Sequence, residues 1–183
     1  GAAKAVLVSD DALKGSDALT TAKVLAKAIE RAGSYDLILA ATESSDGYTG
    51  TVPEQIAEVL GLPSVTFAKA VTIDGTTVKV DRQTEAGYDE VTCPLPALVS
   101  VTAGVVEPRY PSFKGIMAAK KKPVETVSLA DLGVDAGSVG LGGSWSAVVE
   151  FADAPPRAAG TTRSGDAPRM ISCNSRRTGS CVP

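Results

Sequence analysis

The sequence contains no histidine, only three cysteines and few aromatic residues, with Phe, Trp and Tyr making up 4%. Without imidazole, the chain lacks the general base of Ser-His-Asp and Cys-His catalysis and the commonest metal ligand. Cys93, Cys173 and Cys181 are an odd number without Cys-x-x-Cys spacing, so they predict neither a zinc site nor a disulfide framework. We therefore expect reduced thiols, no metal site and no catalytic residues.

Strong net charge and long apolar runs are also missing. The formal net charge is -3 and the pI is about 5.0, which gives no general attraction to phosphate backbones, so no nucleic-acid binding is expected. No apolar run approaches the ~20 residues that cross a bilayer, and residues 1–4 lack the order of a signal peptide. These features predict no membrane insertion and a cytoplasmic or, in a eukaryote, mitochondrial-matrix location.

The first half of the chain shows two successive strand–helix units, which favour an α/β fold with parallel strands. In the first unit, residues 5–8 are apolar. A helix capped by Ser16 or Asp17 is predicted to run to about Arg31, because Leu and Ala recur at three- and four-residue spacing. Gly33 is expected to end this helix.

The second unit begins with the continuous apolar run of residues 36–41, a pattern typical of a strand covered on both faces. Residues 51–54, Thr-Val-Pro-Glu, have the form of a capping box with proline near the first helical position. Gly61 is expected to end the second helix before Pro63.

From Ser64 the pattern changes to alternation, with Asp74-Gly75 and Ala86-Gly87 as turn signals. This pattern predicts an antiparallel hairpin excursion. A further strand over residues 98–102 leads into the segment that follows Gly104. The predicted fold is a Rossmann-like, mostly parallel sheet with helices and this hairpin.

The last part of the chain lacks periodicity. We predict a partial α/β nucleotide-binding domain over residues 1–134 and an extended arm over residues 135–160. Residues 161–183 are rich in Pro, Arg, Ser, Gly and Thr, a composition typical of a disordered tail.

Residues 42–51, between the second strand and its helix, are rich in hydroxyls and glycine and form a candidate phosphate cradle. Backbone N–H groups at a helix N-terminus attract anions, and Gly47 and Gly50 would let a ligand approach. The segment matches neither a Walker loop nor a GxGxxG fingerprint, so an ordinary polar loop stays an alternative. Asp10, Asp11 and Asp17 lack calcium-loop spacing and are interpreted as caps and solvated charges.

Residues 107–123 place Arg109, Tyr110 and Phe113 on a proline-stiffened loop before a helix predicted over residues 115–122. Arg and aromatic side chains dominate binding hot spots, and the run Lys120 to Lys122 would give them a positive rim. The alternative is that Phe113, Ile116 and Met117 pack into the core at helical spacing.

Several segments carry a resemblance to a known family. They are Ser44-Ser45-Asp46-Gly47-Tyr48-Thr49-Gly50, Leu95-Pro96-Ala97-Leu98-Val99-Ser100-Val101, residues 107–123, Ala130-Asp131-Leu132-Gly133-Val134 and Pro155-Pro156-Arg157. With them, residues 5–157 resemble the electron transfer flavoprotein beta subunit. The resemblance implies an alpha subunit that carries FAD and that the arm over residues 135–160 contacts. It also implies electron transfer from acyl-CoA dehydrogenases toward a membrane quinone oxidoreductase.

The resemblance also implies two sets of binding residues. Those for a structural AMP, or for a second FAD in bifurcating relatives, are Ala41, Thr42, Glu43, Ser44, Ser45, Asp46, Gly47, Tyr48, Thr49 and Gly50. We favour AMP. Those for the dehydrogenase are Arg109, Tyr110, Pro111, Ser112, Phe113, Ile116 and Met117, with Phe113 at the position of the family's apolar anchor, which is often Leu.

Two departures from the family shape further expectations. Family members begin upstream of Gly1 with a strand, a helix and a further strand, so the resemblance implies an uncovered face or edge here and weak AMP binding. The segment Met170–Arg177 has no counterpart in the family, and we hypothesise a shifted reading frame after Gly160. The alternatives are a free-standing adenine-nucleotide module of the stress-protein type and an inactive fragment.

Overall fold

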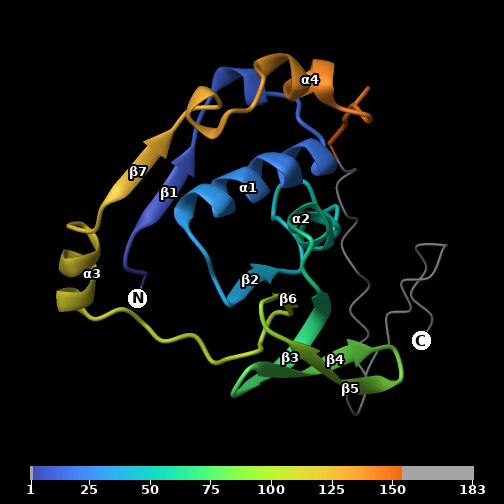
Figure 1. Ribbon diagram of the computed structural model, residues 1–183, viewed down its shortest axis with the longest axis vertical. Coiled ribbons are helices and arrows are strands. Elements are labelled where there is room, and N and C mark those ends of the chain that lie inside the picture. The colour runs from blue at the N-terminus through green and yellow to red at the C-terminus, as the bar shows by residue number, and fades with distance from the viewer. Residues whose placement is uncertain (1, 154–183) are drawn as a thin grey trace, which may run out of the picture. The chain divides into compact units, whose positions relative to one another are not determined.

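A computed structural model describes residues 2–153, of which residues 2–148 belong to one compact unit and residues 149–153 to a second. Figure 1 shows the elements in chain order. They are β1 (Ala5–Val8), η1 (Asp11–Leu13), α1 (Ala18–Ala32), β2 (Leu37–Ala41), α2 (Val52–Leu60), β3 (Ser64–Asp74), β4 (Thr77–Thr84), β5 (Gly87–Pro94), β6 (Ala97–Val101), α3 (Phe113–Ala119), β7 (Val124–Val127), η2 (Ala130–Leu132), η3 (Ala136–Ser138) and α4 (Gly140–Gly143), where η marks a 3-10 helix.

The strands form two sheets. Five strands lie in the order β2-β6-β3-β4-β5, with β2, β6 and β3 parallel and the β3-β4-β5 hairpins antiparallel. A separate parallel pair joins β1 to β7, as Figure 1 shows. The α/β class, the parallel core and the antiparallel excursion are confirmed, whereas β1 and β2 pair with different partners.

Helix α1 follows the sequence prediction closely. The Asp17 carboxylate accepts a hydrogen bond from the Thr20 N–H at 2.9 Å and so caps the helix. Ala22 is buried against Ile56 and Leu98, and Val24 is buried on another side of the helix against Leu129 and Val139. At the other end, the Gly33 N–H donates to the carbonyl oxygen of Ile29. Helix spacing and end signals therefore fixed this element locally.

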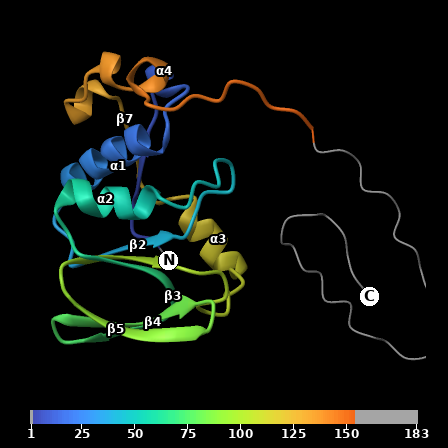
Figure 2. The same ribbon diagram turned by 90° about the vertical axis from the view of Figure 1, so that its right-hand side faces the viewer.

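Strand β6 is the centre of the larger sheet, and its two faces pack against different cores. Leu98 is fully buried against Ala22 of α1 and Ile56 of α2. Ala97 and Val99 face the other core, which lies under the antiparallel hairpins. Figure 2 shows α1 and α2 side by side over this sheet. Burial on both faces explains why β6 is apolar except at Ser100.

The start of α2 differs from the capping-box prediction, which is wrong. Thr51 makes no side-chain cap; its hydroxyl instead accepts a hydrogen bond from the Gln55 side-chain amide at 3.4 Å. The predicted end is confirmed, because Gly61 takes a left-handed conformation with φ of 64° and its N–H donates to the last turn.

The prediction that β2 is covered on both faces is also wrong. Leu39 is 60% exposed, and Leu7 of β1 and Val124 of β7 are exposed as well. An open pocket of about 350 Å³ lies between α1 and these strands, lined by apolar side chains that include Val6, Leu25 and Leu37. Among residues 2–153, helices cover only one side of β2.

Residues 135–143 are not the extended arm that the sequence suggested. They form η3 and α4, which pack against η1, and Val139 is buried with Val24 and Leu129. Elements of three and four residues are too short to show a periodic apolar pattern, so the sequence did not reveal that Val139 completes this small core. Residues 144–153 contain no helix or strand. The predicted tail and its frame-shift hypothesis lie outside the described residues.

Candidate nucleotide loop and docking helix

The nucleotide loop, residues 42–51, leaves the carboxyl edge of the parallel strands. Ala41 of β2 pairs with Val101 of β6, and Val101 pairs with Ala68 of β3, so the ends of β2 and β6 share one row with the residue where the parallel part of β3 ends. The Thr42 hydroxyl donates to the Val101 carbonyl oxygen at 3.0 Å and fixes the start of the loop. This edge is where open α/β sheets bind their ligands.

The middle of the loop is a turn held by its own polar groups. The Gly47 N–H donates to Asp46 Oδ1 at 2.7 Å and to Ser44 Oγ at 3.2 Å, and the Tyr48 N–H donates to the Ser44 carbonyl oxygen. Hydrogen bonding from the Ser44 hydroxyl, and then from the Gly47 N–H, lowers the pKa of Asp46. The Asp46 carboxylate therefore occupies the Gly47 N–H, so that this group is not available to another anion.

The end of the loop offers a better anion site than its middle. The first-turn N–H groups of a helix lack intrahelical partners, and Thr51 provides no side-chain cap for α2. Gly50 has φ of 65°, a conformation that favours glycine. Among the described residues, Glu54 Oε2 and Gln55 Oε1 are buried without a hydrogen-bond partner. The uncapped N–H groups suit an anion such as a phosphate, whereas the Glu54 carboxylate in the same turn opposes one.

Phe67 lies at the same sheet edge and was missed by the sequence analysis. Its φ is 57°, in the left-handed region that an aromatic residue rarely adopts, and β3 has a register shift between Val65 and Ala68. The buried Ser100 hydroxyl accepts a hydrogen bond from the Phe67 N–H at 3.2 Å and holds this bulge. Because the bulge depends on Ser100, 33 residues away in the sequence, the residues around Phe67 alone do not predict it.

The docking helix α3 begins at Phe113 and ends at Ala119, two to three residues earlier than the helix predicted over residues 115–122. The Ser112 hydroxyl caps it by accepting a hydrogen bond from the Gly115 N–H at 3.1 Å. The helix begins at Phe113 because Ser112, which directly precedes it, is a good capping residue.

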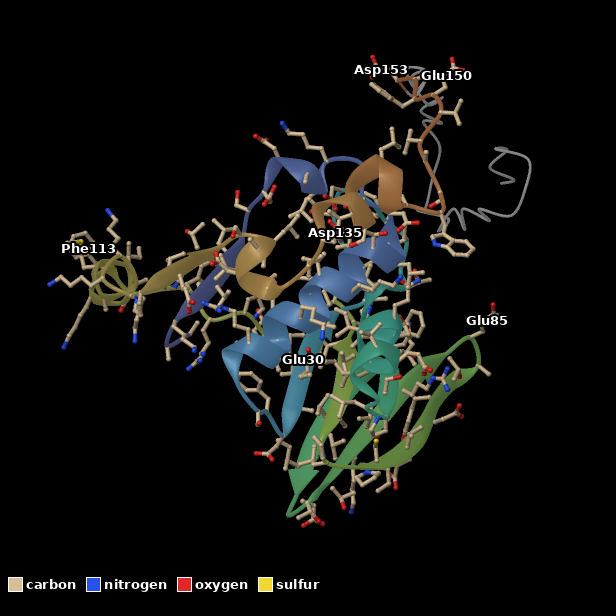
Figure 3. The ribbon with its side chains drawn as sticks, turned by 45° about the horizontal axis from the view of Figure 1, so that its top comes forward. Glu30, Glu85, Phe113, Asp135, Glu150 and Asp153 are labelled. Atoms are coloured by element: carbon tan, nitrogen blue, oxygen red, sulfur yellow. The ribbon has the colours of Figure 1, made fainter. Side chains whose placement is uncertain are left out.

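No residue of α3 is buried, so the core-packing alternative is wrong. Phe113 is 80% exposed, and Tyr110, Ile116 and Met117 are exposed as well. Arg109 and the lysines 114 and 120–122 are also exposed. Figure 3 labels Phe113 on this helix, where nitrogen-tipped side chains surround it. Exposed apolar and exposed basic side chains therefore lie together on and beside α3.

Two of the three acidic residues that raised the question of metal binding act as caps, and the third, Asp11, forms an exposed ion pair with Lys14. Asp10 accepts a hydrogen bond from the Ala12 N–H at 3.0 Å, and Asp17 caps α1. Within residues 2–153, no three His, Cys, Asp or Glu side chains gather in a way that could hold a metal ion. None of the helices in that range is both long and apolar enough to span a bilayer.

A family model described as the electron transfer flavoprotein domain matches residues 1–132. The chain belongs to the electron transfer flavoprotein family. Its curated relatives include the electron transfer flavoprotein subunit beta of Mycobacterium tuberculosis, 44% identical over 160 residues, which cover 87% of this chain and 60% of the relative. The corresponding subunit of Mycobacterium leprae is 42% identical over 173 residues, covering 93% and 65%.

A more distant flavoprotein relative is named the caffeyl-CoA reductase-Etf complex subunit CarD of Acetobacterium woodii. It is 34% identical over 165 residues, which cover 90% of this chain and 63% of the relative. The chain therefore spans 60–65% of the length of these three relatives. Membership of the electron transfer flavoprotein family and similarity to its beta subunits agree with the resemblance found in the sequence.

Proposed function

We propose that this chain acts as the beta subunit of an electron transfer flavoprotein, paired with an alpha subunit that holds most of the FAD. The proposal rests on the family match and on relatives that are named beta subunits. FAD supplies the redox chemistry in such a pair. The beta chain contributes docking and binding surfaces rather than catalytic residues, and the electrons pass from acyl-CoA and related dehydrogenases toward a quinone oxidoreductase.

The docking helix carries this proposal, because it presents an apolar anchor that the domain does not use in its own core. Phe113 is available to enter a pocket on a dehydrogenase, and the lysines around it would speed encounter with an acidic surface. A phenylalanine fills a flatter and longer pocket than a leucine does, so partner preference is expected to differ among relatives.

The nucleotide loop is proposed to bind a structural AMP. The uncapped start of α2 would receive the phosphate, while the orphaned Glu54 and Gln55 oxygens would accept hydrogen bonds from ribose or adenine. The Asp46 carboxylate has to turn away from Gly47 before that N–H becomes available. This competition supports the expectation that AMP binding by the isolated chain is weak.

Co-expression with an electron transfer flavoprotein alpha subunit tests the proposal. We expect a tag on this chain to recover a yellow heterodimer with the absorbance of FAD. Recovery of a flavin-free single chain that binds nucleotide tightly would contradict the proposal and favour a free-standing nucleotide module. Recovery of a heterodimer without flavin would also contradict the proposal, and it would indicate that this chain is an inactive fragment.

A further inference from the structure

Two aromatic residues have an unusual backbone conformation. Among residues 2–153, Tyr48 and Phe67 are the only residues other than glycine with a positive φ, at 49° and 57°. Glycine, asparagine and aspartate tolerate this left-handed region, whereas a bulky side chain there is a genuine outlier. Each such residue costs conformational free energy, and outliers of this kind cluster at ligand sites.

Both residues lie at the carboxyl edge of the parallel strands. Tyr48 is on the nucleotide loop that follows β2, and Phe67 is in the bulge of β3. Ala41, the last residue of β2, and Ala68, which follows Phe67, both pair with Val101 of β6. The segments that carry the two strained residues therefore start on either side of the end of β6.

Hydrogen bonds hold the bulge in place. The Ser100 hydroxyl, which accepts from the Phe67 N–H at 3.2 Å, belongs to a residue that is only 1% exposed. One residue further along, the N–H and the hydroxyl of Thr102 donate to the Ala68 carbonyl oxygen at 2.9 and 3.1 Å. The surrounding structure thus over-determines the conformation of Phe67, which is the condition for backbone strain to persist.

The strain does not serve the hydrophobic core. Val65 and Ala68, on either side of the bulge, belong to the buried cluster under the hairpins. Neither Phe67 nor Tyr48 belongs to any of the three buried clusters that residues 2–153 form, and the two side chains are 41% and 66% exposed. Glycine would adopt the same backbone without strain, as Gly50 does with φ of 65°. The two aromatic rings therefore require a reason outside folding.

The spacing of the strands suits a flat ligand. Neighbouring strands lie about 4.7–4.9 Å apart, so β2 and β3, with β6 between them, are roughly 10 Å apart. A planar ring held between two aromatic side chains needs about 7–8 Å, because carbon atoms in contact lie about 3.5–4.0 Å apart on each face. Every nucleobase has a π face that can stack on an aromatic side chain. The base is therefore the part of a nucleotide that these two rings fit.

We propose that Tyr48 and Phe67 form an aromatic clamp that holds the adenine ring of the bound nucleotide. This inference rests on the proposed function, which supplies the nucleotide. Tyr48 belongs to the loop that is proposed to bind AMP, whereas Phe67 adds a second wall from a strand. Because hydrogen bonds fix the bulge before a ligand arrives, less conformational freedom is lost on binding.

Two substitutions of Phe67 separate the strain from the binding role. Phe67→Ala and Phe67→Gly both remove the ring, but only glycine accepts a φ of 57° without strain. We expect the melting temperature of Phe67→Gly to exceed that of Phe67→Ala by roughly 2–4 °C. Equal melting temperatures, or a lower one for the glycine variant, would overturn the strain on which the clamp rests.

Calorimetry on the heterodimer with the alpha subunit tests the clamp, with AMP compared to ribose 5-phosphate, which lacks the base. We expect Phe67→Ala, Phe67→Gly and Tyr48→Ala each to weaken AMP binding roughly 5- to 140-fold, the range that stacking on one aromatic side chain supplies. Binding of ribose 5-phosphate should stay unchanged, and Phe67→Tyr, which keeps a ring, should bind AMP normally. Tyr88→Ala is the matched control, because Tyr88 is an exposed aromatic residue on β5.

The outcomes distinguish the clamp from the proposed function. AMP affinity that stays within about twofold of the wild type in both Phe67 variants would overturn the clamp alone, as would an equal loss for AMP and ribose 5-phosphate. FAD also contains adenine and is titrated in parallel; tighter binding of FAD than of AMP, weakened by the same variants, would support the clamp with FAD as the source of the adenine. A wild-type heterodimer that binds neither nucleotide would overturn the clamp together with the proposed nucleotide site.

Discussion

Replacement of Phe113 by alanine should separate docking from folding. The side chain is 80% exposed and no residue of α3 is buried, so its removal should change the free energy of unfolding by no more than about 0.5 kcal/mol. Full burial of a phenylalanine in a partner pocket contributes roughly 1.5–3 kcal/mol. At about 1.4 kcal/mol per factor of ten, Phe113→Ala should weaken dehydrogenase binding roughly 10- to 150-fold.

Two measurements on the same protein test this prediction. Urea unfolding gives the stability, and titration calorimetry with an acyl-CoA dehydrogenase gives the affinity. Tyr88→Ala is the control, because Tyr88 is an exposed aromatic on β5 rather than on α3. The reasoning is refuted if Phe113→Ala costs several kcal/mol of stability while docking is normal, or if both variants weaken docking equally.

Three further predictions concern Gly140, Asp46 and Asp17. Gly140→Ala should lower the free energy of unfolding by at least about 1–3 kcal/mol, because φ is 63° and the new Cβ meets the Ala12 carbonyl oxygen, whereas Gly142→Ala, with open space, should change it little in thermal denaturation. Asp46→Asn should strengthen AMP binding, measured by calorimetry at low salt, because a negative charge leaves the loop; weaker binding would contradict the proposed phosphate position. The pKa of Asp17 is about 2, below the ordinary value near 3.9, so its stabilisation is present above about pH 4 and lost as the pH falls toward 2. The stability of Asp17→Asn should therefore fall less than that of the wild type between about pH 4 and pH 2. Identical dependence of stability on pH in the two proteins would contradict this role of the Asp17 carboxylate.

The elements predicted well are those that local sequence determines. Helix α1 has a cap at Asp17, apolar spacing and Gly33 at its end, and all three signals agree with the structure. The antiparallel hairpins also follow their turn signals. Each of these features depends on residues only a few positions apart, which is the range that periodicity and turn chemistry describe.

The features predicted poorly depend on distant partners. An apolar strand such as β2 indicates burial, but Leu39 is exposed because nothing among residues 2–153 covers that face. The pairing of β1 with β7 and the packing of α4 on η1 join opposite ends of the chain. Thr51 has the right residue type for a cap, yet its backbone geometry prevents capping.

In the candidate site, too, the local features could be predicted from the sequence and the features that depend on distant residues could not. The position of the nucleotide loop follows from the order of strand and helix, and the exposure of Phe113 agrees with the hot-spot composition of its segment. The bonds that close Gly47 onto Asp46, and the bulge at Phe67, arise from side chains and a neighbouring strand. Only the three-dimensional structure reveals these constraints.

The central proposal is that this chain brings a dehydrogenase to a flavin held in its heterodimer. Its most direct test is stopped-flow measurement of flavin reduction after the purified heterodimer is mixed with acyl-CoA and an acyl-CoA dehydrogenase. We predict reduction that requires the dehydrogenase, slows at high salt because the lysines around α3 are screened, and needs more dehydrogenase for half-saturation in Phe113→Ala. Reduction that proceeds equally well in the variant, or none in the wild type, would contradict the account.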